Sequence, residues 1–219
     1  MRKHPWDEAR EAVLATAQET VRRGLVVGTS GNVSVRLDQP GRDLLAITPS
    51  GRLYSTLEAA DILVCDFDGS VVQGELPPST ELPTHAAIYR ARPDVRAVVH
   101  THSLYATVAA VATLEIPPIV DEMVVAVGGA VRVADYGFPG TEELGAKAVA
   151  ALVQRSAVLL QNHGLVAVGD SLQDALAVAE LVERMAHVFI VARLLDAVHP
   201  LAGEVVEREA QLYRQRHSL

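Results

Sequence analysis

The stretch Val95-Arg96-Ala97-Val98-Val99-His100-Thr101-His102 decides how the rest of this sequence is interpreted. Its β-branched residues predict a short buried strand over 95–100, with a second histidine just beyond the first. In an extended chain residues i and i+2 project from the same face, so the two histidine side chains leave the strand side by side. That arrangement suits two imidazoles that meet one cation.

Strands and helices alternate along the remainder of the chain. Alternating or β-branched runs predict further strands at 32–37, 44–48, 62–67, 131–136, 157–161 and 165–168. Apolar residues at helical spacing predict helices at 7–23, 81–92, 103–113, 141–154, 173–197 and 204–216. Because no repeat or linker divides the chain, we expect one α/β domain over residues 1–219, with a mixed sheet and helices on its faces.

A third histidine follows another predicted strand, in Gln161-Asn162-His163-Gly164, where the glycine permits a tight bend. Three histidine ligands with an open fourth position are typical of catalytic zinc, whereas structural zinc sites close all four positions. A thiolate cluster is excluded because Cys65 is the only cysteine. The spacing alone leaves open the alternative that these histidines arise by chance or only cap hydrogen bonds.

The other five histidines carry weaker signals. His85 opens a predicted helix close to Glu81 and is a candidate for a supporting role beside a metal. The remaining four are expected to have no part in the site: His4, His187, His199 and His217.

Composition limits the kinds of partner. The chain of 219 residues is 49% hydrophobic and has a formal net charge of −8, which argues against nonspecific nucleic-acid binding. The first ten residues carry no apolar signal segment, and no stretch approaches the roughly 20 apolar residues of a membrane span. We therefore expect a cytoplasmic protein with no nucleic-acid or membrane partner.

Three turn segments are rich in small hydrogen-bond donors, at 28–32, 48–51 and 77–80. The last leads into the Glu81 helix, with Ser79 or Thr80 placed as its N-cap. Backbone amides at such turns and at helix N-termini bind anions without a nearby Lys or Arg. A phosphorylated substrate is therefore compatible with the acidic composition, although turns of this composition are commonly only turns.

Taken in order, the motifs resemble the class II aldolase/adducin family across about residues 24–169. The motifs that carry the resemblance are Gly28-Thr29-Ser30-Gly31-Asn32-Val33-Ser34, Ile47-Thr48-Pro49-Ser50-Gly51, Pro78-Ser79-Thr80-Glu81, His100-Thr101-His102 and Asn162-His163-Gly164-Leu165. The resemblance implies an α/β/α sandwich around a mixed, largely antiparallel sheet. It also implies a homotetramer with active sites between subunits.

The resemblance further implies a reaction and a set of residues for it. Zn²⁺, or another divalent metal, would be held by His100, His102, His163 and Glu81, and Glu81 would also act as acid and base. The substrate phosphate would bind at a group of small polar residues: Asn32, Ser50, Gly51, Ser79 and Thr80. The activity implied is cleavage of a ketose 1-phosphate, a small phosphorylated sugar, to dihydroxyacetone phosphate and an aldehyde through a metal-stabilised enediolate.

The chain departs from the family pattern at a tyrosine position. These aldolases use tyrosines, one of them from a neighbouring subunit's C-terminal region, to protonate the aldehyde oxygen. Tyr213 is the counterpart expected in the tail, but Glu122 stands where the other tyrosine is expected. The aldehyde pocket is therefore expected to differ.

Other reactions of the same site are open alternatives. A dehydratase or decarboxylase would keep the metal and the carboxylate. Epimerases of the family place Asp where this chain has Glu81, which disfavours epimerisation. A non-enzymatic adducin-like module is also disfavoured, because such a module has no need of zinc ligands.

Overall fold

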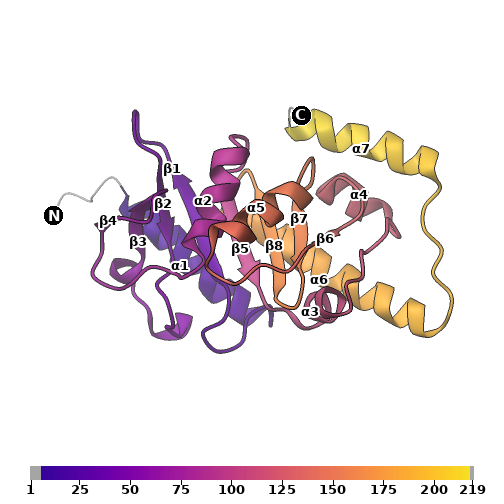
Figure 1. Ribbon diagram of the computed structural model, residues 1–219, viewed down its shortest axis with the longest axis horizontal. Helices are drawn as coiled ribbons and strands as arrows, with labels where there is room; N and C mark the ends of the chain where they lie inside the picture. Colours follow the sequence, from indigo (N-terminus) through magenta and orange to yellow (C-terminus); the bar gives the residue numbers. More distant parts are fainter. Residues whose placement is uncertain (1–5, 218–219) are drawn as a thin grey trace.

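An eight-stranded sheet organises the computed structural model, which describes residues 6–217 (Figure 1). The strand order is β4-β3-β2-β1-β5-β8-β7-β6. The strands are β1 (Asn32–Leu37), β2 (Leu44–Ile47), β3 (Leu63–Asp66), β4 (Val71–Gln73), β5 (Ala97–Thr101), β6 (Arg132–Ala134), β7 (Ala157–Leu160) and β8 (Gly164–Gly169). Every neighbouring pair is antiparallel except β6 and β7, which are parallel.

Helices cover both faces of this sheet. They are α1 (Asp7–Arg22), α2 (Leu82–Ala91), α3 (Leu104–Val111), α4 (Asp121–Val127), α5 (Glu142–Ala151), α6 (Leu172–Leu194) and α7 (Gly203–His217). Two short 3-10 helices, Tyr54–Thr56 and Ala59–Asp61, precede β3. Within residues 6–217, no helix combines the length and the hydrophobicity that crossing a bilayer requires.

Two hydrophobic cores lie on opposite sides of the sheet. One contains side chains of α1, α3, α4 and α6, and the other contains side chains of α2 and α5. Successive strand residues alternate between them: Ala97 and Val99 belong to the first core and Val98 to the second. A strand buried on both faces is hydrophobic without interruption, which explains the continuous apolar run at 97–99. The predicted α/β/α sandwich with a mixed, largely antiparallel sheet is therefore confirmed.

Besides the two 3-10 helices, one strand and one α-helix were not predicted from the sequence. The edge strand β4 has three residues, too few for an alternating pattern to be recognised. The sequence of α4 is mainly β-branched and apolar, a composition that favours a strand. It is a helix because Met123, Val124 and Val127 are buried together and Gly128 ends it in the left-handed conformation, at φ +93°.

Strand directions bring distant segments to one edge of the sheet. Because β5 and β7 are both antiparallel to β8, they run in the same direction and end at the same edge. The start of β1 also lies there, since Asn32 pairs with His100. The edge therefore collects His100 from β5, His102 from the residues directly after β5, and His163 from the turn between β7 and β8.

Gly164 allows the turn that carries His163 to lie close to the end of β5. A Cβ atom on Gly164 would overlap the carbonyl oxygen of Thr101 and lie 3.1 Å from Cδ2 of His102. The position needs glycine because two backbones approach closely, as the sequence motif around His163 suggested.

We expect Gly164→Ala to lower the free energy of unfolding by about 1–3 kcal/mol, because the added methyl group has no free space. The same substitution at Gly203, where a Cβ would meet nothing within 4 Å, is the matched control and should be nearly neutral. Urea denaturation of the two variants measures the difference. Equal stabilities would contradict the close approach at Gly164.

Candidate metal centre and substrate pocket

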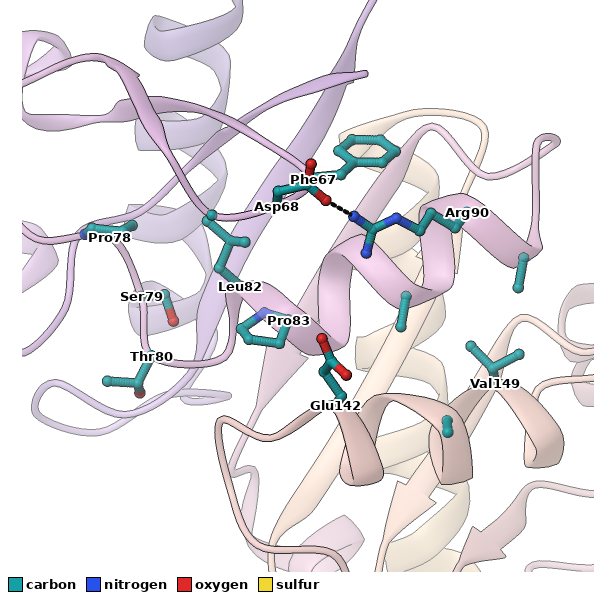
Figure 2. A pocket seen from close by; sticks show the side chains of 14 residues that line it. Phe67, Asp68, Pro78, Ser79, Thr80, Leu82, Pro83, Arg90, Glu142 and Val149 are labelled. Atoms are coloured by element: carbon teal, nitrogen blue, oxygen red, sulfur yellow. Dashed lines mark hydrogen bonds and ion pairs between the residues drawn. The ribbon is translucent and has the colours of Figure 1, made fainter. Parts of the chain in front are cut away.

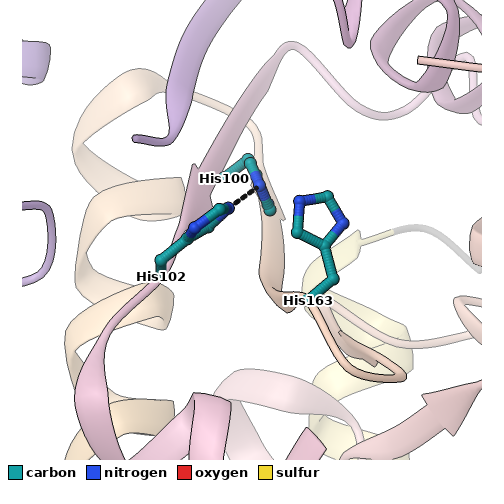
Figure 3. A group of neighbouring side chains, drawn as sticks. All are labelled: His100, His102 and His163. Atoms are coloured by element: carbon teal, nitrogen blue, oxygen red, sulfur yellow. Dashed lines mark hydrogen bonds between the residues drawn. The ribbon is translucent and has the colours of Figure 1, made fainter. Parts of the chain in front are cut away.

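Three histidine rings face one another at this edge of the sheet (Figure 3). Each pair of ring centroids among His100, His102 and His163 is 4.8 Å apart. One ring nitrogen from each lies within 4.8 Å of the other two, and the Nε2 atoms of His100 and His102 are 2.9 Å apart. Nitrogen atoms that converge in this way are suited to a shared cation.

The tautomer of His100 is determined by a backbone carbonyl group on the neighbouring strand β8. Its Nδ1–H donates a hydrogen bond of 2.9 Å to the carbonyl oxygen of Leu165, and the residue is 1% exposed. In the neutral ring the lone pair is then on Nε2, the nitrogen nearest His102. A ligand histidine is commonly oriented by such a bond from its other ring nitrogen.

Glu81 lies against the histidine cluster. One carboxylate oxygen is 3.0 Å from Nε2 of His100 and the other is 3.2 Å from Nε2 of His163. Glu81 is the residue immediately before α2 and is 8% exposed. The structure thus brings together all four residues that were predicted to hold the metal.

Burial and charge determine the protonation of this group. Burial raises the pKa of Glu81, but His100, His163 and the hydrogen bond from Asn32 outweigh it, and the pKa falls well below its usual value. Burial lowers the pKa of His102 and of His163 to about 4, with His100 adding to the effect. At neutral pH the site therefore presents an ionised carboxylate and at least two neutral imidazoles, the forms that bind metal ions.

Asn32 and His85 support the Glu81 carboxylate through a series of hydrogen bonds. Nδ2 of Asn32 donates a hydrogen bond of 2.7 Å to Glu81, and Oδ1 of Asn32 is bonded to Nε2 of His85. His85 also contacts Ser34 through Nδ1, at 2.6 Å. Asn32 was predicted only as a phosphate ligand, so its contact with Glu81 was missed. The available sequence signal was the position of His85 one helical turn after Glu81.

A pocket of about 200 Å³ opens beside the histidines. All five residues predicted to bind phosphate line it: Asn32, Ser50, Gly51, Ser79 and Thr80. Glu81, His102 and His163 line the same pocket, so an anion bound by the three turns would lie next to the metal centre. Pro139 also lines it and was not identified from the sequence.

A larger groove of about 1010 Å³ lies between α2, α5 and the turn after β3 (Figure 2). Its walls include Phe67 and Val149, and an ion pair joins Arg90 to Asp68. It shares Ser79 and Thr80 with the smaller pocket but none of the three histidines. Chemistry rather than volume therefore makes the smaller pocket the candidate site.

The structure places Tyr213 away from the histidines of its own chain. Tyr213 is 1% exposed, and its hydroxyl lies 2.9 Å from Oγ of Ser156. Ser156 precedes β7 and His163 follows it, so the two lie at opposite ends of that strand. Glu122, at the other tyrosine position, forms an ion pair with Arg184 on the surface. The catalytic role of Tyr213 stays a prediction.

The remaining histidines lie elsewhere. His187 stacks on Tyr105 and His217 packs against Tyr213, while His199 is exposed after α6. His4 is outside the described residues.

The fold and the histidine cluster together define a candidate metalloenzyme centre built on a mixed-sheet α/β/α sandwich. The profile of the Class II Aldolase and Adducin N-terminal domain family matches residues 11–190, and the chain belongs to this family. The resemblance found in the sequence motifs is therefore confirmed.

Two relatives that match most of the chain are named as aldolases. The chain is 36% identical to the 5-deoxy-D-ribulose 1-phosphate aldolase of Bacillus thuringiensis serovar kurstaki, over 93% of this chain and 94% of that protein. It is 37% identical to the L-fuculose phosphate aldolase of Escherichia coli strain K12, over 89% of this chain and 88% of that protein. These relatives agree with the prediction of an enzyme, a carbon–carbon lyase of the class II aldolase type.

Solved structures agree on the fold. An L-fuculose 1-phosphate aldolase superposes with a TM-score of 0.89 at 36% identity and covers 94% of this chain and 96% of its own. The L-fuculose-1-phosphate aldolase from Thermus thermophilus superposes with a TM-score of 0.72 at 27% identity, over 89% and 98% of the two chains.

We expect the metal-free protein to lose stability as the pH falls below about 6.5. Burial lowers the pKa of His85 from 6.5 to about 3, so between these values the unfolded state binds more protons than the folded state. The free energy of unfolding then falls on acidification by up to about 1.4 kcal/mol per pH unit for this group, and His102 and His163 add to the slope.

Urea titrations across this pH window measure the slope. His85→Gln has no titrating ring, so its slope should be smaller by the contribution of about one proton. A slope identical to that of the unmodified chain would show that His85 is not buried in its neutral form.

Proposed function

We propose that the protein is a zinc-dependent aldolase that cleaves a ketose 1-phosphate to dihydroxyacetone phosphate and an aldehyde. The observation that carries the proposal is the convergence of three histidines and Glu81 beside a pocket lined by the small polar turns. The names of the curated relatives, which are aldolases for 5-deoxyribulose 1-phosphate and fuculose phosphate, support it.

The residues present fit a divalent cation. His100, His102 and His163 would hold it, with Glu81 as a fourth ligand in the resting state. Three imidazoles with a displaceable fourth position are typical of catalytic zinc. When bound, such an ion acts as a Lewis acid that stabilises negative charge on substrate oxygen atoms.

The chain's own residues would bind the substrate and move a proton. Ser50, Gly51, Ser79 and Thr80 would hold the phosphate, because hydroxyl groups and backbone amides in turns bind anions. Cleavage breaks the C3–C4 bond: the C4 hydroxyl gives its proton to solvent water as it becomes the aldehyde, and the electron pair of the bond remains on the dihydroxyacetone phosphate fragment. Glu81, which would take up a proton from solvent, would deliver it to C3, and in the condensation direction Glu81 would remove that proton.

We further propose a homotetramer with active sites between subunits. Apolar side chains exposed on neighbouring helices support an association surface, since such patches mark interaction sites. They are Leu104, Val108 and Val111 on α3, with Val188, Val191 and Leu194 on α6. In such an assembly Tyr213 would belong to the tail that approaches a neighbour, and light scattering of the purified protein tests the mass.

The first test of the reaction is hydrogen exchange on dihydroxyacetone phosphate. Zinc-loaded protein in D₂O is expected to exchange one C3 proton, followed by NMR, because the half-reaction needs no aldehyde. Glu81→Gln keeps the shape of the side chain but cannot accept the proton, so exchange should fall by about 100-fold or more.

Two results would count against this mechanism. Normal exchange by Glu81→Gln would remove Glu81 from the proton transfer. No exchange by the folded, zinc-replete protein would reject the dihydroxyacetone phosphate aldolase and favour a dehydratase or a decarboxylase of the same site.

The metal ligands are tested separately by elemental analysis. We expect about one zinc ion per chain in the unmodified protein and loss of the ion from His100→Ala, because a catalytic site has only three firm protein ligands. His199→Ala, at an exposed position after α6, is the matched control and should keep the metal. Undiminished zinc in a folded His100→Ala protein would contradict the assignment.

A further inference from the structure

A chain of buried polar side chains leads from Glu81 into the interior. Asn32 and Ser34 come from β1, and His85 and Tyr89 come from α2. Asn32 is 4% exposed, Tyr89 is 1% exposed, and Ser34 and His85 are fully buried. The contacts run from Glu81 to Asn32, then to His85, Ser34 and Tyr89.

The direction of every hydrogen bond in this chain follows from its first member. An ionised carboxylate only accepts, so Asn32 must turn its NH₂ group toward Glu81. Its carbonyl oxygen Oδ1, which also only accepts, then faces Nε2 of His85. His85 must therefore carry its proton on Nε2.

The hydrogen bonds beyond the His85 ring run in the same direction. A buried neutral imidazole with a proton on Nε2 accepts at Nδ1, so Ser34 donates its hydroxyl proton to His85. The oxygen of Ser34 is then free to accept from the hydroxyl of Tyr89, 2.8 Å away. All donors point toward Glu81, and each member of the chain is satisfied in only this one direction.

We infer that His85 is a positioning residue that holds the Asn32 amide with its NH₂ group toward Glu81 and its oxygen away from the pocket. Without a donor at Nε2 of His85, the amide could rotate and present Oδ1 to the carboxylate. Two acceptors would then face each other in a buried site, which is costly because neither has a partner.

The orientation of the Asn32 amide also affects how the substrate phosphate binds. This consequence rests on the proposed function. Asn32 lines the pocket, and an amide nitrogen has two N–H groups. One is used by Glu81, and the second is available to the phosphate. By excluding the rotated amide, His85 keeps a carbonyl oxygen from facing two anions, the carboxylate and the phosphate.

The direct test needs neither substrate nor activity. In ¹H–¹⁵N NMR spectra of the intact, zinc-loaded protein at neutral pH, His85 should be neutral, with a proton on Nε2 and none on Nδ1. A proton on Nδ1, or an imidazolium ring, would overturn the inference. This result does not depend on whether the enzyme is an aldolase.

Variants then test the role of the ring in turnover. His85→Leu fills similar space without a donor, and His85→Gln restores an N–H near the position of Nε2. With proton exchange on dihydroxyacetone phosphate as the probe, we expect kcat of His85→Leu to fall about 10- to 100-fold, the usual range for residues that orient a metal site. His85→Gln should recover a substantial part of that loss.

Measuring kcat and zinc content together distinguishes loss of the positioning role from general disruption of the metal site. Zinc bound per chain should be unchanged in both variants, because three histidine ligands remain. His199→Leu, which removes an exposed histidine, is the control and should behave as the unmodified protein. Equal kcat values for folded His85→Leu and the unmodified chain would overturn the inference, as would equal losses in His85→Leu and His85→Gln. If His85→Leu does not fold, the NMR assignment of the ring still decides.

Discussion

The contact of the Glu81 carboxylate with the imidazoles of His100 and His163 is the interaction on which the rest of the site depends. It places a charge in a largely buried position, where an isolated carboxylate would be strongly disfavoured. His100, His163 and Asn32 offset that cost, and the pKa of Glu81 falls in spite of burial. A divalent cation bound by the same nitrogens would occupy the position that the Glu81 carboxylate faces. Glu81 therefore suits the proposed role of a metal ligand that can also leave.

The sheet supplies the rigidity that this contact requires. His100 lies within β5, and both its neighbours in the sheet, β1 and β8, contribute to the site or to its support. Leu165 on β8 orients the ring of His100, and Asn32 on β1 pairs with it in register. Ligands held on strands keep their geometry more accurately than ligands on free loops. His100 lies within β5 and His102 directly follows it, whereas Glu81 and His163 lie in turns.

The three turns at 28–32, 48–51 and 77–80 differ in kind from the candidate metal ligands. They line the pocket mainly with small polar side chains and turn backbone, in a protein whose net charge is −8. Binding of an anion would therefore depend on aligned amides and hydroxyls rather than on excess positive charge. The larger groove beside α2 and α5 shares only the turn at 77–80 and is lined by none of the three histidines, so its size does not by itself indicate a binding site.

The sequence by itself predicted the fold class, most of the elements and the three histidines of the candidate metal centre, and the family resemblance added Glu81. Strand alternation, helical spacing and the motifs around His100 and His163 are properties of neighbouring residues, and a sequence displays them directly. The strand β4 was not predicted because three residues are too few to show an alternating pattern. The helix α4 was not predicted because its sequence favours a strand and only burial in the core makes it a helix. Tertiary structure alone decided that Asn32 supports Glu81, that His85 orders the buried chain behind it, and that Tyr213 is packed against Ser156. Those contacts join segments far apart in the chain, and they depend on strand order and helix packing, which no local pattern encodes.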